Sequence, residues 1–314
     1  MPALTLPEAA KLAANNGETK KAGIISLYAE KSDILAVIPV DGIMGSAYSF
    51  TQEGDLPATA FRGVNEGFTP STGTFNPQIE ALFAAGGDLD VDRFIVKTQG
   101  EEARSKHEGL KVKSLSANIT DTIITGDNSS EPREFNGLQV RCTGDQLIAQ
   151  GSTSGGDTLT LAKLDELLDT VNGATHLIMS RAMRRLFQTA ARSPTVTNNQ
   201  VTDDMDSDLG RRVTRYQGIP ILTGYERTKN TGILPFSEAN PGGGSAVGTS
   251  IYAVNFRAED GFTLISNGGI DVRDLGELED KPAYRTRVEW YVGSAQQSPY
   301  CAARLWGIKT GAIA

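Results

Sequence analysis

Two histidines are the first residues to consider for chemistry in this chain. His107 is followed by Glu108, as in the zinc-binding pattern His-Glu-x-x-His, but Lys111 stands where the second histidine should be. The pattern needs two imidazoles on one helix face to hold the metal, so it fails here. His176 lies in "THLIM", which predicts a short strand, and no partner for a general base is evident. We therefore expect neither histidine to be catalytic.

The acidic run "DDMDSDLG" resembles part of a calcium-binding loop. Asp204, Asp206 and Asp208 match the first, third and fifth positions of an EF-hand loop. The sixth position holds Leu209 instead of glycine, and the twelfth holds Arg215 instead of glutamate. Because two essential positions fail, we expect a solvated acidic loop and no metal site.

The run "GSTSG" at 151–155 resembles a nucleophile elbow, but its centre is Thr153 and no strand-turn-helix context surrounds it. The chain contains no phosphate-binding Gly-x-x-x-x-Gly-Lys-Ser/Thr pattern and no Gly-x-Gly-x-x-Gly. The sequence thus offers no catalytic, cofactor-binding or metal-ligating residue, and no cofactor is expected. A hydrolase built on Thr153 and His176 is the remaining enzyme hypothesis.

A cluster of arginines follows the predicted strand "THLIM" in "SRAMRRLFQTAAR", which predicts a helix with Ser180 as its N-cap. The cluster consists of Arg181, Arg184, Arg185 and Arg192. These side chains could contact phosphate, but a solvated helix face that pairs with acidic neighbours is the favoured interpretation.

The overall composition is that of a globular protein. The 314 residues are 39% apolar and 22% charged, and 34 glycines and 13 prolines imply many turns. The net charge of −8 gives no dominant basic footprint for nucleic acid, and no apolar stretch approaches membrane-spanning length. Cys142 and Cys301 are expected to be reduced and buried. We find no signal-peptide pattern, and we expect synthesis in a cytoplasm.

The first half of the chain is predicted to contain two short helices, a long loop and a long helix. "LPEAAKLAANNG" is a helix between Pro7 and Gly17, a second helical segment follows, and "ILAVIPV" is interpreted as a strand. Residues 46–87 are rich in Gly, Pro, Thr and Phe, with strand-like pieces "AYSFTQ" and "ATAFRG". A loop of this length needs a function, and a hairpin that reaches a neighbour would supply one, with a flexible surface insertion as the alternative.

Residues 88–125 predict a long helix, weakened at Gly100 and Gly109 and ended by Gly126. A helix, a strand and a second helix are expected within 157–192, and two strands in "RRVTRYQGIPILTG". The last part is predicted to be strands, above all "YRTRVEWYV". There Tyr284 to Val292 alternate between an apolar face and a face with Arg285, Arg287 and Glu289.

The order of these elements resembles the major capsid proteins of tailed bacteriophages, which have the HK97-like fold. The resemblance covers nearly the whole chain and rests on element order, with "LIMSRAMRRL", "YQGIPIL" and "SPYCAARL" in the expected places. It implies an α+β fold with an N-terminal arm at 1–45, an extended E-loop at 46–87 and an axial domain at 151–255. A peripheral domain with the spine helix would occupy 88–150 and 256–314.

The resemblance also interprets the polar run "ITGDNSSEPREFNGLQV" as the corner where the spine helix ends. Gly126 and Gly137 are expected to adopt left-handed backbone conformations, while Asp127, Asn128 and Ser129 cap free backbone groups. Some family members join neighbours through an E-loop lysine. Between Tyr48 and Val96 the basic residues are only Arg62 and Arg93, so we predict no isopeptide bond here.

The implied function is a structural, non-enzymatic subunit that assembles into hexamers and pentamers of an icosahedral phage head around double-stranded DNA. Expected partners are other copies, a portal, decoration proteins and nonspecific DNA contacts, with the arm lysines Lys11, Lys20 and Lys21 facing inward. No membrane contact is expected. Because the chain starts almost directly with the arm, we expect a separate scaffolding protein or none. An encapsulin-type nanocompartment shell has the same fold and is the nearest alternative.

Overall fold

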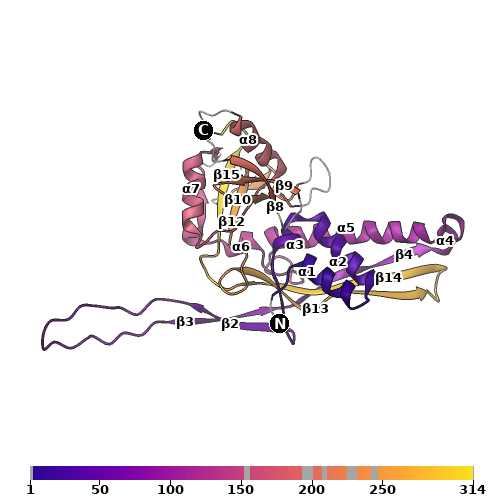
Figure 1. Cartoon of the computed structure of the whole chain (residues 1–314), viewed down its shortest axis with the longest axis horizontal. Helices are drawn as coiled ribbons and strands as arrows, with labels where there is room; N and C mark the ends of the chain where they lie inside the picture. Colours follow the sequence, from indigo (N-terminus) through magenta and orange to yellow (C-terminus); the bar gives the residue numbers. More distant parts are fainter. Residues whose placement is uncertain are drawn as a thin grey trace.

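The computed structural model describes residues 3–151, 156–192, 201–206, 211–224, 232–241 and 247–313. Figure 1 shows three parts: a long flat layer in which helices lie on a sheet, a more compact unit at one end, and a thin hairpin that projects away from both. Helices and strands are mixed through the chain, as the predicted α+β class requires.

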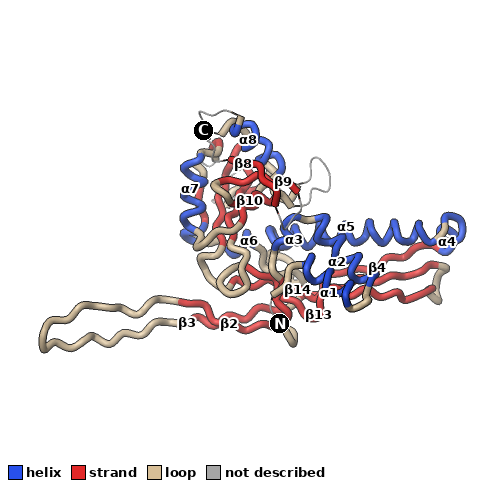
Figure 2. Tube along the Cα trace, viewed as in Figure 1, coloured by secondary structure: helices blue, strands red, loops and turns tan. Residues whose placement is uncertain are grey.

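The flat layer is a sheet in the order β1-β13-β14-β4, with β1 parallel to β13 and the other neighbours antiparallel. Figure 2 shows a long helix, α5, running along this sheet. The strands are β1 (Val40–Gly42), β4 (Phe83–Asp92), β13 (Phe262–Glu277) and β14 (Ala283–Gln296). The helices are α1 (Leu6–Asn15), α2 (Thr19–Lys31), α3 (Asp33–Val37), α4 (Arg93–Gln99), α5 (Glu101–Thr125) and α6 (Leu138–Arg141).

The compact unit is built on a second sheet, in the order β5-β15-β12-β7-β10-β9-β8, with β6 beside β15 and β11 beside β12. Its strands are β5 (Leu147–Ala149), β6 (Asp157–Thr158), β7 (His176–Ile178), β8 (Val201–Asp206), β9 (Arg211–Tyr216), β10 (Ile219–Leu222), β11 (Glu238–Ala239), β12 (Val247–Val254) and β15 (Ala302–Lys309). Its helices are α7 (Leu161–Thr170) and α8 (Arg181–Ala191), and a 3-10 turn, η1, spans Gly144–Gln146.

The buried apolar residues form two clusters: one joins the flat layer to the near side of the compact unit, and the other lies within the compact unit. In the flat layer, Trp290 of β14 is 1% exposed, meets Tyr28 of α2 edge-on and donates to the Ser266 hydroxyl at 2.8 Å. In the compact unit, Leu164 and Phe187 of the two helices are fully buried. The predicted alternation of β14 is confirmed, because Thr286, Val288, Trp290 and Val292 are all buried.

Several predicted elements are confirmed. The N-terminal helix, the strand "THLIM" and the two strands on either side of "QG" form as expected. The Ser180 side chain caps α8 by accepting from the Met183 amide at 3.2 Å. Cys142 and Cys301 are free thiols and are buried, and burial raises the pKa of each to about 12.

Three secondary-structure predictions are wrong. "ILAVIPV" contains α3 before β1, because the Ser32 hydroxyl accepts from the Leu35 amide and starts a helical turn. Residues 88–92 belong to strand β4, and the long helix α5 begins only at Glu101. The break before it falls at Gly100, whose positive φ of 82° ends α4. "ATAFRG" at 58–63 forms no strand, whereas Phe75–Ala81 does form one.

The polar corner after α5 is a joint, but its glycines act differently from the prediction. Gly126 and Gly137 have φ values of −54° and −86°, so neither is left-handed. Gly137 is required by close packing, because a Cβ there would lie 2.6 Å from the Thr122 carbonyl oxygen. Asp127 caps the turn as expected, since hydrogen bonds from Ser129 and Ser130 lower the pKa of its carboxyl to about 2.

Candidate assembly surfaces

His107 and Glu108 differ in their surroundings on α5. His107 is exposed on α5, while Glu108 points toward the sheet. The Glu108 carboxylate accepts a hydrogen bond from the Thr286 hydroxyl at 2.8 Å and lies 3.4 Å from the Arg104 guanidinium. The glutamate therefore connects the long helix to β14.

Of the two anchors of the hydrolase hypothesis, His176 and Thr153, the structure describes only His176. The His176 ring packs against Phe256 with 5.3 Å between centroids, and its Nδ1 lies 2.9 Å from the Thr175 hydroxyl. Thr153 lies outside the described residues. His176 is thus a partly buried strand residue within the sheet.

The described part of the acidic run, residues 203–206, belongs to strand β8 instead of a loop. β8 pairs antiparallel with the arginine-rich β9, and Asp206 stands opposite Arg211 in this pairing. Asp203 and Asp204 are exposed, whereas Asp208 and Leu209 lie outside the described residues. Within the ranges that the structure describes, no group of three or more His, Cys, Asp and Glu residues could hold a metal ion, and no helix could cross a membrane.

The arginine cluster of α8 lies mostly on the outside of the compact unit. Arg181, Arg185 and Arg192 are exposed, while Arg184 is half-buried. The predicted solvated helix face is therefore present. The alternative, a contact with phosphate, remains a hypothesis.

The most unusual surface is the hairpin of β2 (Ala47–Glu53) and β3 (Phe75–Ala81), which projects from one end of the flat layer (Figure 1). Seven residue pairs join the two strands, from Ala47 with Ala81 to Glu53 with Phe75. Beyond the strands, the chain continues through residues 54–74 without a β-ladder. This hairpin forms its own two-stranded sheet and has almost no core.

The hairpin carries large apolar side chains that its own chain does not cover. Phe61 and Val64 have relative exposures of 107% and 93%. The full set of exposed large apolar residues in or beside the hairpin is Met44, Leu56, Phe61, Val64, Phe68, Phe75 and Ile79. A soluble surface rarely gathers so many apolar side chains on one segment unless a partner covers them.

The root of the hairpin is fixed to the flat layer by Arg141. Its Nη1 pairs with the Glu80 carboxylate of β3 at 2.7 Å. Its Nη2 donates to the Ser294 carbonyl at 3.0 Å, and its Nε donates to the Asn136 carbonyl at 3.0 Å. One guanidinium thus joins β3, β14 and the polar corner, so the direction of the hairpin is set by the body.

Hydroxyl groups hold the outer hairpin together where the ladder stops. The Thr74 hydroxyl accepts from the Asp55 amide at 2.8 Å, and the Ser71 hydroxyl accepts from the Ala58 amide at 2.9 Å. Gly54 lets the two backbones approach, because a Cβ there would lie 2.4 Å from the Thr74 hydroxyl. The two chains therefore stay adjacent well beyond β2 and β3.

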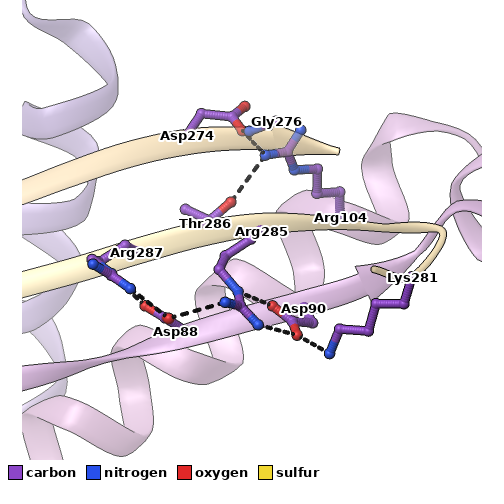
Figure 3. Close-up of polar contacts among 9 residues, drawn as sticks. All are labelled: Asp88, Asp90, Arg104, Asp274, Gly276, Lys281, Arg285, Thr286 and Arg287. Carbon is purple, nitrogen blue, oxygen red and sulfur yellow. Dashed lines mark hydrogen bonds and ion pairs between the residues drawn. The ribbon is translucent and has the colours of Figure 1, made fainter. Parts of the chain in front are cut away.

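A ladder of ion pairs covers the face of the flat sheet that turns away from α5 (Figure 3). Arg285 binds Asp90 with two bonds of 2.6 and 2.8 Å, and Arg287 binds Asp88 with two of 2.7 and 2.9 Å. Both pairs stand directly opposite in the β4–β14 register, and Lys281 also contacts Asp90. Hydrogen bonds from Arg285 and Arg287 lower the pKa of Asp90 and Asp88, respectively.

The other face of the same strands is joined to the long helix. Arg104 of α5 lies 2.6 Å from the Asp274 carboxylate of β13 and 3.0 Å from the Thr286 hydroxyl of β14 (Figure 3). The guanidinium is largely buried between helix and sheet. Charged contacts therefore hold both faces of the flat layer, which forms a stiff support for the projecting hairpin.

The comparisons with known proteins agree with this architecture. Residues 15–161 match the model of the family "Major capsid protein GP7". No protein with a curated description matches the chain.

Solved structures cover the chain more completely. The SrpI encapsulin complex of Synechococcus elongatus is 15% identical, with a TM-score of 0.63 over 88% of this chain and 87% of that one. Microbacterium phage Oxtober96 gives 12% identity and a TM-score of 0.61, with coverages of 88% and 90%. The structure from Mycobacterium phage Adephagia is 12% identical, with a TM-score of 0.61 over 89% of this chain and 90% of that one.

The likeness extends over about nine tenths of each chain. At these low identities the likeness establishes the fold, and the family match covers residues 15–161. The chain therefore has the HK97-like fold, and its residues 15–161 are similar to the major capsid proteins of the GP7 family.

Proposed function

We propose that this protein is the main structural subunit of an icosahedral bacteriophage head, arranged as hexamers and pentamers around double-stranded DNA. The observation that carries the proposal is the projecting hairpin with its exposed apolar side chains. Burying one such side chain contributes about 1.5–3 kcal/mol, so several of them on a neighbour's surface would hold two subunits together. A head-to-tail contact of this kind closes into rings.

The parts of the chain receive roles within this shell. Residues 1–45 are the arm, 46–87 the E-loop, 151–255 the axial domain, and 88–150 with 256–314 the peripheral domain. The strand pairing supports a slightly earlier end of the E-loop, since Phe83 already pairs with Val292 of the flat sheet. The arm lysines Lys11 and Lys21 would supply the nonspecific contacts with packaged DNA.

Further partners follow from a phage head: a portal, decoration proteins and a separate scaffolding protein. No lysine lies in the hairpin, so its contact with the neighbour is noncovalent. Denaturing gels of purified particles should therefore give a single band of about the monomer mass. A ladder of covalently linked oligomers would contradict this part of the proposal.

An encapsulin-type shell is the second candidate, and the likeness to the SrpI encapsulin favours it. The two candidates differ in their contents. Particles recovered from a producing cell would contain nuclease-protected double-stranded DNA in the first case and a co-purifying protein cargo in the second.

The test is electron microscopy of the expressed chain after size-exclusion chromatography, beside a variant in which residues 56–72 are replaced by Asn-Gly. We expect closed shells, rings or tubes from the unaltered chain and monomers from the variant. The variant keeps β2 and β3, so circular dichroism can check that its body is folded. Assembly of the shortened chain as efficient as that of the unaltered chain would contradict the role given to the hairpin.

A further inference from the structure

Several asparagines in this chain are followed directly by glycine. They are Asn16, Asn136, Asn172 and Asn267. Asparagine is chemically labile, and a following glycine offers the least steric hindrance to attack on its side-chain amide. The fold gives each of these pairs a different environment, so the pairs should differ in their chemical stability.

The pair Asn267–Gly268 lies in a bulge of β13. The pairing with β14 runs as far as Ser266 and resumes at Ile270, so residues 267–269 have no opposite residue in this register. All three are exposed. The two glycines have φ values of +81° and +72°, and a Cβ on either would meet no atom within 4 Å. An accessible carboxamide thus stands on a backbone that neither the ladder nor packing fixes.

In two of the other pairs the glycine amide already has a hydrogen-bond acceptor. At the end of α1, the Gly17 amide donates to the Ala14 carbonyl at 3.1 Å. In the polar corner, the Gly137 amide donates to the Gly126 carbonyl at 2.8 Å. Each of these nitrogens must lose its hydrogen bond before it can turn toward the preceding side chain.

The backbone at Asn172 is fixed from both sides. Its amide donates to the Tyr300 carbonyl at 3.1 Å, and its own carbonyl accepts from the Asn255 side chain at 3.0 Å. These bonds attach the asparagine to two other segments of the chain. Asn267 therefore has the least constrained backbone of the set.

The reaction open to such a pair is deamidation. The backbone nitrogen of Gly268 attacks Cγ of Asn267, so a C–N bond forms and the Cγ–Nδ2 bond breaks. Ammonia leaves with the proton of the Gly268 amide, and the chain is left with a cyclic succinimide. Water then opens the ring at either carbonyl and gives aspartate or isoaspartate. Nothing is oxidised or reduced, and water is the sole co-reactant.

The side chain that would be lost connects the flat sheet to the base of the hairpin. The Nδ2 of Asn267 donates to the Gly45 carbonyl at 3.0 Å in an exposed contact. Gly45 lies between β1 and β2 and has a φ of +108°. Deamidation replaces this donor by a carboxylate, so two acceptor oxygens would face each other.

We infer that Asn267 is a site of spontaneous covalent modification, which converts to aspartate or isoaspartate as the protein ages and releases the bond between the bulge and Gly45. The extra backbone atom of isoaspartate falls within the bulge, so the strand pairing on either side is kept. The inference goes beyond the proposed shell function and does not depend on it, because the reaction needs only the folded chain and water.

The test is peptide mapping by mass spectrometry of the purified full chain after storage in mildly alkaline buffer. Cleavage after lysine and arginine places the asparagines in separate peptides, 12–20, 134–141, 164–181 and 258–273. Deamidation adds about one dalton to a peptide. We expect peptide 258–273 to gain this mass at least about threefold faster than the others, because those pairs must first break a backbone hydrogen bond.

Two controls separate the fold from the local sequence. Asn267→Gln keeps a carboxamide but requires a larger ring, so peptide 258–273 should then keep its mass while the other peptides are unchanged in rate. In denaturant the lead of Asn267 should shrink. The inference is overturned if the folded chain converts Asn16 or Asn172 as fast as Asn267, or if the lead is the same in denaturant.

The released bond is measured separately by hydrogen exchange of the amides at 43–46. Asn267→Asp carries the product carboxylate and should exchange faster there than the unaltered chain, and aged protein should change in the same direction. Asn16→Asp, on an exposed side chain at the end of α1, is the matched control and should have no effect at 43–46. Equal exchange in Asn267→Asp and the unaltered chain would overturn the role given to the contact with Gly45.

Discussion

The hairpin and the flat layer are both built from long antiparallel strands, yet they treat their side chains in opposite ways. In the flat layer, β14 buries Trp290 and Val288 beneath the helices and pairs Arg285 and Arg287 with aspartates on its other face. In the hairpin, β2 and β3 pair their backbones but leave Phe75 and Ile79 uncovered. The flat layer buries its apolar side chains within the monomer. The hairpin satisfies its backbone hydrogen bonds but leaves its apolar side chains exposed.

This difference teaches that stability and assembly are assigned to separate parts of the chain. Substitutions in the flat layer should change the free energy of unfolding, whereas substitutions in the outer hairpin should change assembly alone. The following predictions test this division, from the largest effect on stability to the smallest.

Trp290→Ala should destabilise the monomer by about 3–5 kcal/mol, because it opens a cavity in the core and removes the contact with Tyr28. Urea unfolding of the unassembled protein measures the change. Tyr291→Ala is the matched control, since the adjacent side chain is 44% exposed and its removal should cost under about 1 kcal/mol. Similar losses of unfolding free energy in both variants would mean that the two faces of β14 do not differ in their contribution to stability.

Arg141→Gln should destabilise the body by about 1–3 kcal/mol, because Glu80 and the Ser294 carbonyl lose a charged donor. The substitution affects the joint between the two regions, so it should also widen the range of hairpin directions and reduce assembly. Denaturant unfolding and particle yield are measured on the same preparation. Arg133→Gln, on the exposed side of the polar corner, is the control and should leave both quantities unchanged.

Acid should weaken the flat layer through its ion-pair ladder. The pKa values of Asp88 and Asp90 are lowered by hydrogen bonds from Arg287 and Arg285, so the folded state holds these carboxylates ionised more strongly than the unfolded state does. The resulting stability is present above their ordinary pKa of about 4 and is lost as the pH falls below it.

The measurement is the melting temperature of the unassembled protein between about pH 6 and pH 2.5. The double variant Asp88→Asn with Asp90→Asn should have a flatter profile over the acid half of this range. Because the pairs are partly exposed, the effect should also shrink at high salt. Parallel profiles for the two proteins would mean that other carboxylates control acid unfolding.

Replacement of residues 56–72 by Asn-Gly should have the smallest effect on stability. The removed segment contributes no residue to either hydrophobic core, so unfolding should change by less than about 1 kcal/mol. The same variant should lose assembly. A large loss of monomer stability would show that the hairpin supports the body, which would end the proposed division.

The sequence predicts the elements of the flat layer where a local pattern, such as strand alternation, is enough to specify the element. The alternation in "YRTRVEWYV" predicts β14 because a strand with one buried face repeats every second residue. "DLDVD" at 88–92 has the same alternation, but a helical segment follows it, so the sequence pattern places it in the long helix. Its strand depends on Arg285 and Arg287, which are almost 200 residues away in sequence.

The candidate site could be predicted in place but not in detail. Length and composition predict a projecting hairpin at 46–87, but Pro77 and the polar residues weaken the pattern of the strand at Phe75–Ala81. Nothing local indicates that Phe61 is uncovered while Phe68 lies beneath Arg62. That difference follows from how the turn folds on itself.

The sequence by itself determined the local features of this protein: the Ser180 cap, the alternating face of β14, the apolar character of its cysteines' surroundings, and a hairpin without lysine. Only the tertiary structure decided that β4 is a strand, that Gly137 is needed for a close backbone approach, and that the turn at 61–68 is held by hydrogen bonds while Phe61 stays exposed. The physical reason is that caps and alternation depend on adjacent residues, whereas register, close packing and exposure depend on which distant segments meet.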